Sequence, residues 1–169
     1  MTLSFGRVHL PDDERAVVEF LTASTWPFHG SARLTPDAAA DVAVDNLDVQ
    51  SFWIMLDDAR IGLIRLLDLG DLDDGSPLFD LRLAEGHRGR GIGARAVEWL
   101  TAHLFTEFPE LHRIEATTRH DNLPMQAVFA RCGYRLEGRL VEAWTSADGN
   151  RYDTLLYAML RREFVARSG

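Results

Sequence analysis

The residues whose types and spacing could do chemistry lie in a glycine-rich turn, His87–Arg95, which reads HRGRGIGAR. An apolar, strand-like segment precedes the turn at 78–83, and apolar residues at helical spacing follow it. Glycines let backbone N–H groups approach a phosphate closely, because no Cβ stands in the way. The first turn of the following helix adds unpaired N–H donors and a positive dipole end. The sequence therefore predicts a phosphate-binding turn between a strand and a helix.

Two of the three known kinds of phosphate loop fit this turn. A Walker-type loop needs a lysine, and the chain contains none. A dinucleotide fingerprint, G-x-G-x-x-G/A, is satisfied by Gly89, Gly91 and Ala94, with Glu115 near the place of a ribose-binding acid. That fold, however, needs a βαβαβ run around the motif, and this chain ends instead in a hairpin-like pair. An acyl-CoA loop, R/Q-x-x-G-x-G/A, is met by Arg88, Gly91 and Gly93.

A second motif downstream favours the acyl-CoA loop. Residues Thr117–Tyr134 read TTRHDNLPMQAVFARCGY. This segment resembles the N-x-x-M/S-x-x-V/L-x-x-x-x-G-F/Y segment of the GCN5-related N-acetyltransferases (GNAT). The resemblance spans roughly residues 3 to 162 and is closest to the RimJ/RimL-type branch, which contains ribosomal-protein N-terminal acetyltransferases. A catalytically silent acyl-CoA-binding module and, more remotely, a nicotinamide-dependent oxidoreductase remain alternatives.

The resemblance implies an α+β fold and an activity. The expected fold is a mixed, mostly antiparallel central sheet with helices on both faces and a splay between the strands at 78–84 and 113–118. The expected activity is N-acetyltransferase: acetyl-CoA is the acyl donor, and a primary amine on a protein N-terminus or small molecule attacks it directly in a ternary complex. The acceptor's identity stays open.

The resemblance also assigns cofactor residues to positions of this chain. Arginines suit phosphate oxygens, although Arg88 and Arg90 could equally be solvated surface charges. Asn122 matches the family's asparagine at the start of the next helix, where it could also serve as a plain helix N-cap. The expected cofactor-binding set is Leu83, Ala84, Arg88, Gly89, Arg90, Gly91, Ile92, Gly93, Ala94 and Asn122.

Three residues are candidates for the chemical step. Asp80 is a charge in an apolar strand beside the expected thioester site, where burial can raise a carboxyl pKa and make it a general base. A salt bridge with Arg82 or another arginine is the structural alternative. Glu115, on the partner strand, competes for the role. Asn122 is the third candidate, because the family's asparagine contacts the cofactor arm or an ordered water. Many relatives carry a tyrosine as general acid where this chain has Phe129, so no general acid is assigned.

An aromatic loop between the first two predicted helices is the candidate acceptor site. Trp26, Phe28 and His29 lie in it, flanked by Pro27 and Gly30. Aromatic rings could form a pocket wall and hold a cationic amine. Core packing is the alternative.

Composition narrows the remaining classes. The 169 residues form a single domain, 1–169, of ordinary size. A net charge of −8 argues against nucleic-acid binding, and no apolar run approaches the ~20 residues of a membrane helix. One cysteine and scattered histidines predict neither disulfides nor a metal site. A cytoplasmic monomer or homodimer is expected.

Periodicity and turn residues predict the elements that position these residues. Gly133 is expected to end the second-motif helix, and Asp148–Gly149 to make a hairpin turn. Helices are expected to start near 14 and 36, after the glycine turn, and over 122–132; strands over 4–10, 52–56, 61–67, 78–83, 113–118, 134–145 and 152–160; and a polar loop over 68–77.

Overall fold

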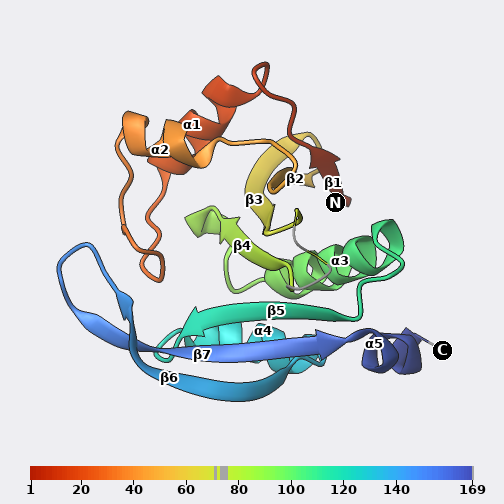
Figure 1. The fold of residues 1–169 in the computed structure, drawn as a ribbon. Helices are drawn as coiled ribbons and strands as arrows, with labels where there is room; N and C mark the ends of the chain where they lie inside the picture. Colours follow the sequence, from red (N-terminus) through yellow and green to blue (C-terminus); the bar gives the residue numbers. More distant parts are fainter. Residues whose placement is uncertain (71, 73–75, 169) are drawn as a thin grey trace.

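A computed structural model describes residues 1–70, 72 and 76–168, and it has two antiparallel sheets (Figure 1). The four-stranded sheet has the order β1 (Leu3–Arg7), β2 (Gln50–Leu56), β3 (Ala59–Leu67) and β4 (Leu78–Leu83). The three-stranded sheet has the order β5 (Arg113–Arg119), β7 (Arg151–Leu160) and β6 (Arg135–Thr145). The helices are α1 (Glu14–Ala23), α2 (Pro36–Val42), α3 (Ile92–Glu107), α4 (Leu123–Cys132) and α5 (Arg161–Ser168), with a 3₁₀ turn at Glu85–His87.

The two sheets meet at the start of β4 and β5. There the Glu115 N–H donates to the Pro77 carbonyl at 3.2 Å. Farther along, a cavity lies between the strands, lined by Leu83 of β4 and by Asn122 just beyond β5. The predicted α+β fold and the predicted splay are thus confirmed, and the splay divides the central sheet into two hydrogen-bonded parts.

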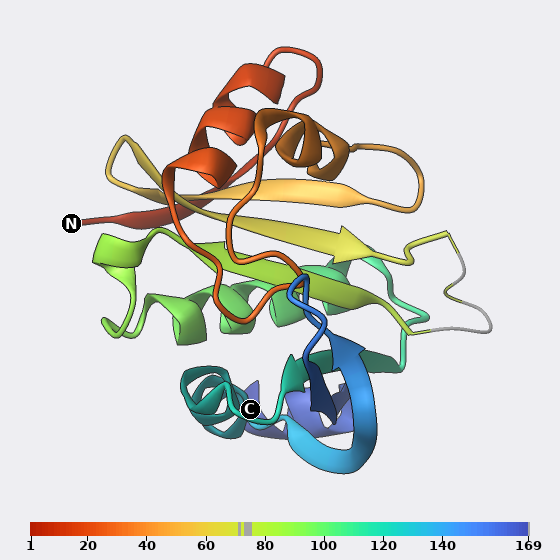
Figure 2. The same ribbon diagram turned by 90° about the vertical axis from the view of Figure 1, so that its left-hand side faces the viewer.

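Helices cover both faces of the four-stranded sheet (Figure 2). Leu81 and Leu83 pack with α3 in the main core, whereas Leu63, opposite Arg82 in the β3–β4 register, packs with α1 and α2. Side chains alternate between faces along a strand. Asp80 and Arg82 therefore lie on the α1–α2 face of β4.

Local signals at the helix ends agree with the sequence. The Thr35 hydroxyl accepts from the Ala38 N–H and caps α2. Gly133 adopts φ 84° at the end of α4, a left-handed conformation that favours glycine. The Asp148–Gly149 turn joins β6 to β7.

Two elements were not predicted from the sequence, the 3₁₀ turn and α5. Arg161, at the start of α5, donates to the carbonyls of Phe105, Phe108 and Leu111 around the end of α3. The predicted polar loop over 68–77 lies partly outside the described residues. Among those that are described, no helix has the length and apolar character needed to cross a membrane.

Candidate active site

The glycine turn has the geometry of an anion-binding loop. Gly89 and Gly91 adopt φ of 70° and 77°, and a Cβ added at either would meet no atom within 4 Å. Gly91 is the N-cap of the 16-residue helix α3, so the unpaired N–H groups of its first turn face the open space beside the turn. These glycines thus leave room for a phosphate against backbone donors.

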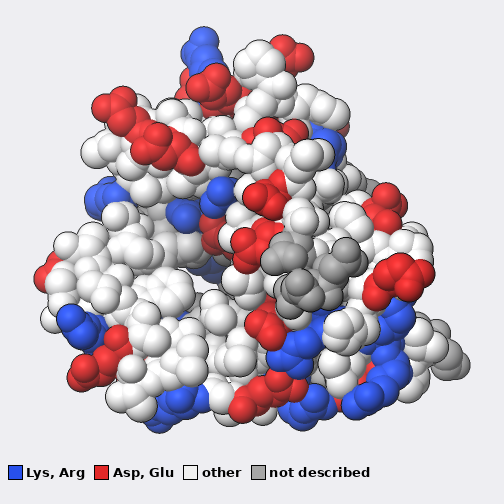
Figure 3. Space-filling model, viewed as in Figure 1, with Lys and Arg blue, Asp and Glu red and all other residues white. Residues whose placement is uncertain are grey.

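A cavity of about 480 Å³ joins this turn to β4, α4 and the loop between α1 and α2. Figure 3 shows a hollow between the two halves of the molecule, with basic side chains on its upper wall. Most of the predicted site residues line the cavity together: Trp26, Phe28, His29, Leu83, Arg88, Gly89, Gly91, Gly93, Ala94 and Asn122.

Three predicted cofactor residues are not among the described residues that line the cavity. Ala84 already donates its N–H to the Ile61 carbonyl of β3 at 2.9 Å, so this donor is not free for the cofactor. Arg90 is exposed to solvent. Ile92 is 7% exposed and packs in the core, which leaves only its backbone for an anion.

Arg88 connects the glycine turn with the aromatic loop. Its Nε donates to the Leu83 carbonyl at 2.8 Å, its Nη2 donates to the Thr25 carbonyl, and its guanidinium lies over the Trp26 ring. This side chain was expected to contact phosphate. Its hydrogen bonds instead go to backbone carbonyls, so it retains its positive charge beside the cavity without a carboxylate partner among the described residues.

Asp80 lies in a cluster of basic groups on the α1–α2 face. Its Oδ1 is 2.8 Å from His29 Nε2, and its Oδ2 accepts from Arg82 Nε at 3.0 Å, with Arg65 Nη1 at 3.9 Å. Burial on its own raises the pKa of this carboxyl. The His29 and Arg82 contacts outweigh burial and hold the pKa well below its ordinary value. The expectation of a raised pKa is therefore wrong, and the alternative of a salt bridge with Arg82 is the arrangement found; the additional contact with His29 was not predicted.

His29 is the group that Asp80 orients. When Nε2–H donates to the carboxylate, Nδ1 carries the lone pair that can accept a proton. His29 Nδ1 is buried and has no hydrogen-bond partner in the described part of the chain. Because His29 also lines the cavity, the pair resembles a base with its orienting group.

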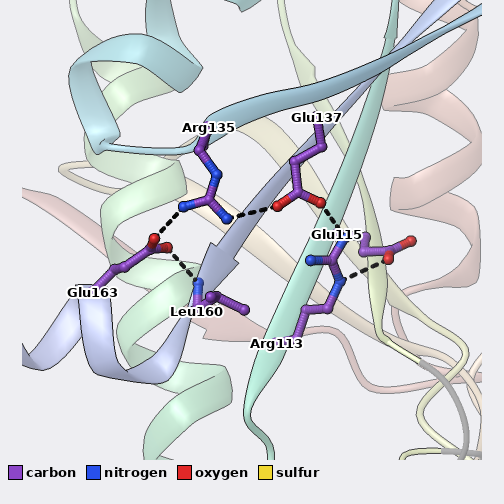
Figure 4. Close-up of polar contacts among 6 residues, drawn as sticks. All are labelled: Arg113, Glu115, Arg135, Glu137, Leu160 and Glu163. Atoms are coloured by element: carbon purple, nitrogen blue, oxygen red, sulfur yellow. Dashed lines mark hydrogen bonds and ion pairs between the residues drawn. The ribbon is translucent and has the colours of Figure 1, made fainter.

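Glu115 lies in a ladder of ion pairs across the three-stranded sheet (Figure 4). It accepts from Arg113 Nε at 2.8 Å, and Arg113 also pairs with Glu137 at 2.7 Å. Arg135 then joins Glu137 to Glu163 of α5. Glu115 is not among the described residues that line the cavity. The geometry therefore favours the structural ion pair over the alternative of a second base.

Asn122 caps α4 and faces the cavity. Its side-chain oxygen accepts from the Met125 N–H at 3.3 Å, and its amide donates to Thr118 Oγ1 at 3.0 Å. The N-cap half of its expected dual role is present. Contact with a cofactor stays a prediction.

The aromatic loop contains both core and cavity residues. Trp26 is only 1% exposed, donates from Nε1 to the Leu21 carbonyl, and packs in the α1–α2 core, although one side lines the cavity. Phe28 is half-buried, and the Arg119 guanidinium lies over its ring. Of the two, Phe28 is thus better placed to contact an acceptor.

The position of the missing general acid is in the core. Phe129 is 1% exposed and packs against the rings of Phe79, Tyr134 and Tyr157. The Tyr134 hydroxyl pairs with Thr101, and burial raises the Tyr134 pKa. Neither side chain supplies an acid to the cavity.

Some lining residues were not predicted. Pro124, Val128 and Arg131 present one face of α4 to the cavity, and their i, i+4, i+7 spacing could have revealed that face. Arg82 also lines the cavity. Its position two residues after Asp80 in a strand placed both on one face, which was a usable signal.

The structure also bears on two other kinds of cofactor, metal ions and dinucleotides. Among the described residues, no cluster of three or more His, Cys, Asp or Glu side chains could hold a metal ion. The antiparallel sheets also differ from the parallel βαβ arrangement that a dinucleotide fingerprint requires. The glycine turn therefore belongs to a different cofactor class.

Comparisons with known proteins agree with this geometry. No curated protein matches the chain. Solved structures match nearly its whole length at low identity, which shows a common fold. Spermidine/spermine N-acetyltransferase SpeG from Vibrio cholerae is 21% identical with a TM-score of 0.78, covering 99% of this chain and 100% of that one. Aminoglycoside acetyltransferase AAC(6')-Ib in complex with coenzyme A gives the same four values.

A further structural match and a family model complete the comparison. RimL, a ribosomal L7/L12 alpha-N-protein acetyltransferase in complex with coenzyme A, is 17% identical with a TM-score of 0.82, covering 96% of each chain. The model of the acetyltransferase (GNAT) family matches residues 16–134. Because this match spans well over half of the sequence and includes both motifs, the chain belongs to the GNAT family of acetyltransferases.

Proposed function

We propose that this protein transfers an acetyl group from acetyl-CoA to a primary amine by direct attack in the cavity between β4 and β5. The observation that carries the proposal is the meeting of the open glycine turn and the His29–Asp80 pair on one cavity. The similar structures named above act on spermidine and spermine, on aminoglycosides and on a ribosomal protein N-terminus. All are amine acceptors.

The residues present fit acetyl-CoA. Gly89 and Gly91 leave space for the pyrophosphate, and the first turn of α3 supplies N–H donors to it. Leu83 and the α4 face, with Val128 and Arg131, would hold the arm. When bound, acetyl-CoA supplies the reactive acetyl thioester.

His29 and Asp80 divide the work of a base. His29 Nδ1 takes the proton of the attacking amine, and Asp80 holds the ring in the required tautomer and stabilises its charged form. Asp80 thus acts through His29. Glu115 stays the alternative base, and Asn122 stays the predicted contact to the cofactor arm or an ordered water.

Release of free thiol from acetyl-CoA tests the proposal. The purified protein is mixed with acetyl-CoA and a panel of amines, and thiol is followed with a chromogenic reagent. We expect thiol release that requires both the amine and the protein and that stops when either is left out. Binding of acetyl-CoA without release for any amine would instead favour a silent acyl-CoA-binding module. Cytoplasmic location and a monomeric or dimeric state stay predictions.

A further inference from the structure

The acceptor side of the cavity carries more positive than negative charge. Arg65 and Arg82 both face the Asp80 carboxylate, so two guanidinium groups share one anion. Both arginines are largely buried: Arg82 is 8% exposed, and the Arg65 side chain is 15% exposed. A buried charge without a full complement of partners is costly. This pair therefore has capacity for one more anion.

Unpaired donors mark the place of that anion. Arg82 Nη1 and Arg65 Nε are buried and have no hydrogen-bond partner in the described part of the chain. Arg82 itself lines the cavity. Burial and the neighbouring Arg82 also lower the pKa of Arg65, as expected where a guanidinium lacks sufficient counter-charge. A planar, hydrogen-bonding anion would satisfy these donors.

The charged residues that line the cavity are also positive. Its lining includes Arg82, Arg88 and Arg131, and none of its described lining residues is Asp or Glu. A polycation such as a polyamine or an aminoglycoside would meet like charge here. The net charge of −8 is thus a property of the outer surface, not of the site.

The face of the sheet places this anion with the acceptor. Arg65, Asp80 and Arg82 lie on the α1–α2 face of β3 and β4, beside His29. The phosphate-binding turn begins α3, which packs on the opposite face. An anion at Arg82 is therefore close to the base and separated from the phosphates.

We propose that the acceptor is an amine that also bears a carboxylate, such as an α-amino acid or a short peptide, and that Arg82 with Arg65 behind it binds that carboxylate. The inference rests on the proposed acetyl transfer for its biological meaning, but the subsite itself is a binding site. Arg82 positions the acceptor and leaves the proton to His29.

Calorimetry with CoA-loaded protein tests the subsite directly. Matched pairs of L-amino acids and their carboxamides differ only in the anion. We expect each acid to bind roughly 10- to 100-fold more tightly than its amide, the range for hydrogen bonds to charged groups. Spermidine and kanamycin should bind more weakly than the acids. Equal affinity within the pairs, or tighter binding of the polycations, would overturn the proposal.

Variants then locate the effect. Arg82→Gln should bring the acid-to-amide ratio close to one, and Arg82→Lys should restore part of it. Arg15→Gln removes the same charge from the exposed face of α1 and should leave the ratio unchanged. A ratio that persists in folded Arg82→Gln would contradict the assignment. If that variant does not fold, the acid–amide comparison in the wild-type protein still decides.

Further experiments distinguish a carboxylate on the acceptor from one on the acyl donor, and they test the carboxylate subsite separately from acetyl transfer. Succinyl-CoA carries a carboxylate on the donor, so turnover of carboxamides with succinyl-CoA but not acetyl-CoA would move the anion to the donor and overturn the acceptor assignment. Carboxylate-selective binding without thiol release would contradict acetyl transfer but would still support the carboxylate subsite. Acetyl transfer without carboxylate preference would do the reverse.

Discussion

At the scale of single residues, the Asp80 carboxylate lies among three basic side chains on the α1–α2 face of β4. A charge in an apolar strand indicated a special role, and the structure supplies its neighbours: His29, Arg82 and Arg65. Arg82 lies only two residues away and could be named from the sequence as a salt-bridge partner, but His29 and Arg65 lie far from Asp80 along the chain, so no local pattern could show them. The sequence therefore indicates that Asp80 matters, whereas its contact with His29 is visible only in the structure.

Kinetic measurements should show whether Asp80 and His29 act as a unit. Asp80→Asn and His29→Gln are each expected to lower turnover by roughly 10²–10⁴-fold at neutral pH, the usual contribution of a general base. The double variant should lose little more than either single one, because the two residues act as a unit. Both deficits should shrink at high pH, where the amine deprotonates unaided. Glu115→Gln is the matched comparison, and a larger loss there than in Asp80→Asn would transfer the role to Glu115.

Acid unfolding should report the Asp80 contacts independently. The pKa of Asp80 is below its ordinary value of about 3.9 in the folded protein. The unfolded chain therefore takes up a proton at a higher pH than the folded one. The stabilisation from the ion pairs is present above about pH 4 and is lost as pH falls through the lowered folded pKa.

Asp80→Asn should accordingly be less stable at pH 7 by about 3–5 kcal/mol, since it leaves buried arginines unpaired. Its denaturant midpoint should also vary less between pH 5 and pH 2 than that of the wild-type protein. An unchanged pH dependence would mean that the carboxylate is not preferentially ionised in the folded state.

At the scale of elements, the glycine turn and the start of α3 are the proposed binding site for the cofactor's phosphates. Gly91→Val places a branched side chain at φ 77° and in the open space beside the turn. We expect a loss of acetyl-CoA affinity, measured by calorimetry, with the melting temperature recorded alongside. Gly86→Val is the control, because that glycine also has open space but no positive φ. Normal folding of Gly91→Val with unchanged acetyl-CoA affinity would refute the assignment of this turn.

The aromatic loop contains a core residue, Trp26, and a proposed acceptor contact, Phe28. Trp26→Ala should cost roughly 3–5 kcal/mol of stability, because a buried indole leaves a cavity in the α1–α2 core. Phe28→Ala should cost less stability and raise the KM for the amine, with acetyl-CoA affinity nearly unchanged. Thermal unfolding and both KM values decide. Equal stability loss in the two variants would place Phe28 in the core as well.

Elements with local signals were predictable from the sequence, and elements held by distant contacts were not. The Thr35 cap and Gly133 act on their own neighbours, so α2 and α4 have the predicted ends. Helix α5 carries no apolar stripe of its own. Its Arg161 donates to backbone carbonyls at the end of α3, and its Glu163 pairs with Arg135 at the start of β6. These partners are distant in the sequence and are brought together only by the fold.

The same distinction applies to the candidate site. The Arg88–Gly93 turn and Asn122 were predicted because their motifs resemble those of the GNAT family, and the helix caps at Gly91 and Asn122 involve only nearby backbone. The Arg82 subsite and the His29–Asp80 pair needed the register of β3 with β4 and the return of the α1–α2 loop. Alternation along the strand predicts that Asp80 and Arg82 share a face, but it does not predict that His29 and Arg65 lie beside them.

At the scale of the whole molecule, the splay between the two sheets brings the proposed donor and acceptor sites to one cavity. The loop between α1 and α2 crosses from the four-stranded to the three-stranded sheet. There Arg119 donates to the Pro27 carbonyl, and Ala147 of the β6–β7 hairpin donates to the Gly30 carbonyl (Figure 2). Arg88 fixes the loop's other end to the glycine turn. The amine and the thioester can thereby be held side by side, which alone can contribute about 7–11 kcal/mol to lowering the barrier.

The fate of a labelled acetyl group tests this arrangement most directly. The protein is incubated with acetyl-CoA deuterated in its acetyl group and with a carboxylate-bearing amine, and both protein and amine are weighed by mass spectrometry. The account predicts that the label appears on the amine nitrogen and that the protein mass never changes, because attack is direct. Label on the protein, for example on Cys132, or no labelled amine at all, would contradict it.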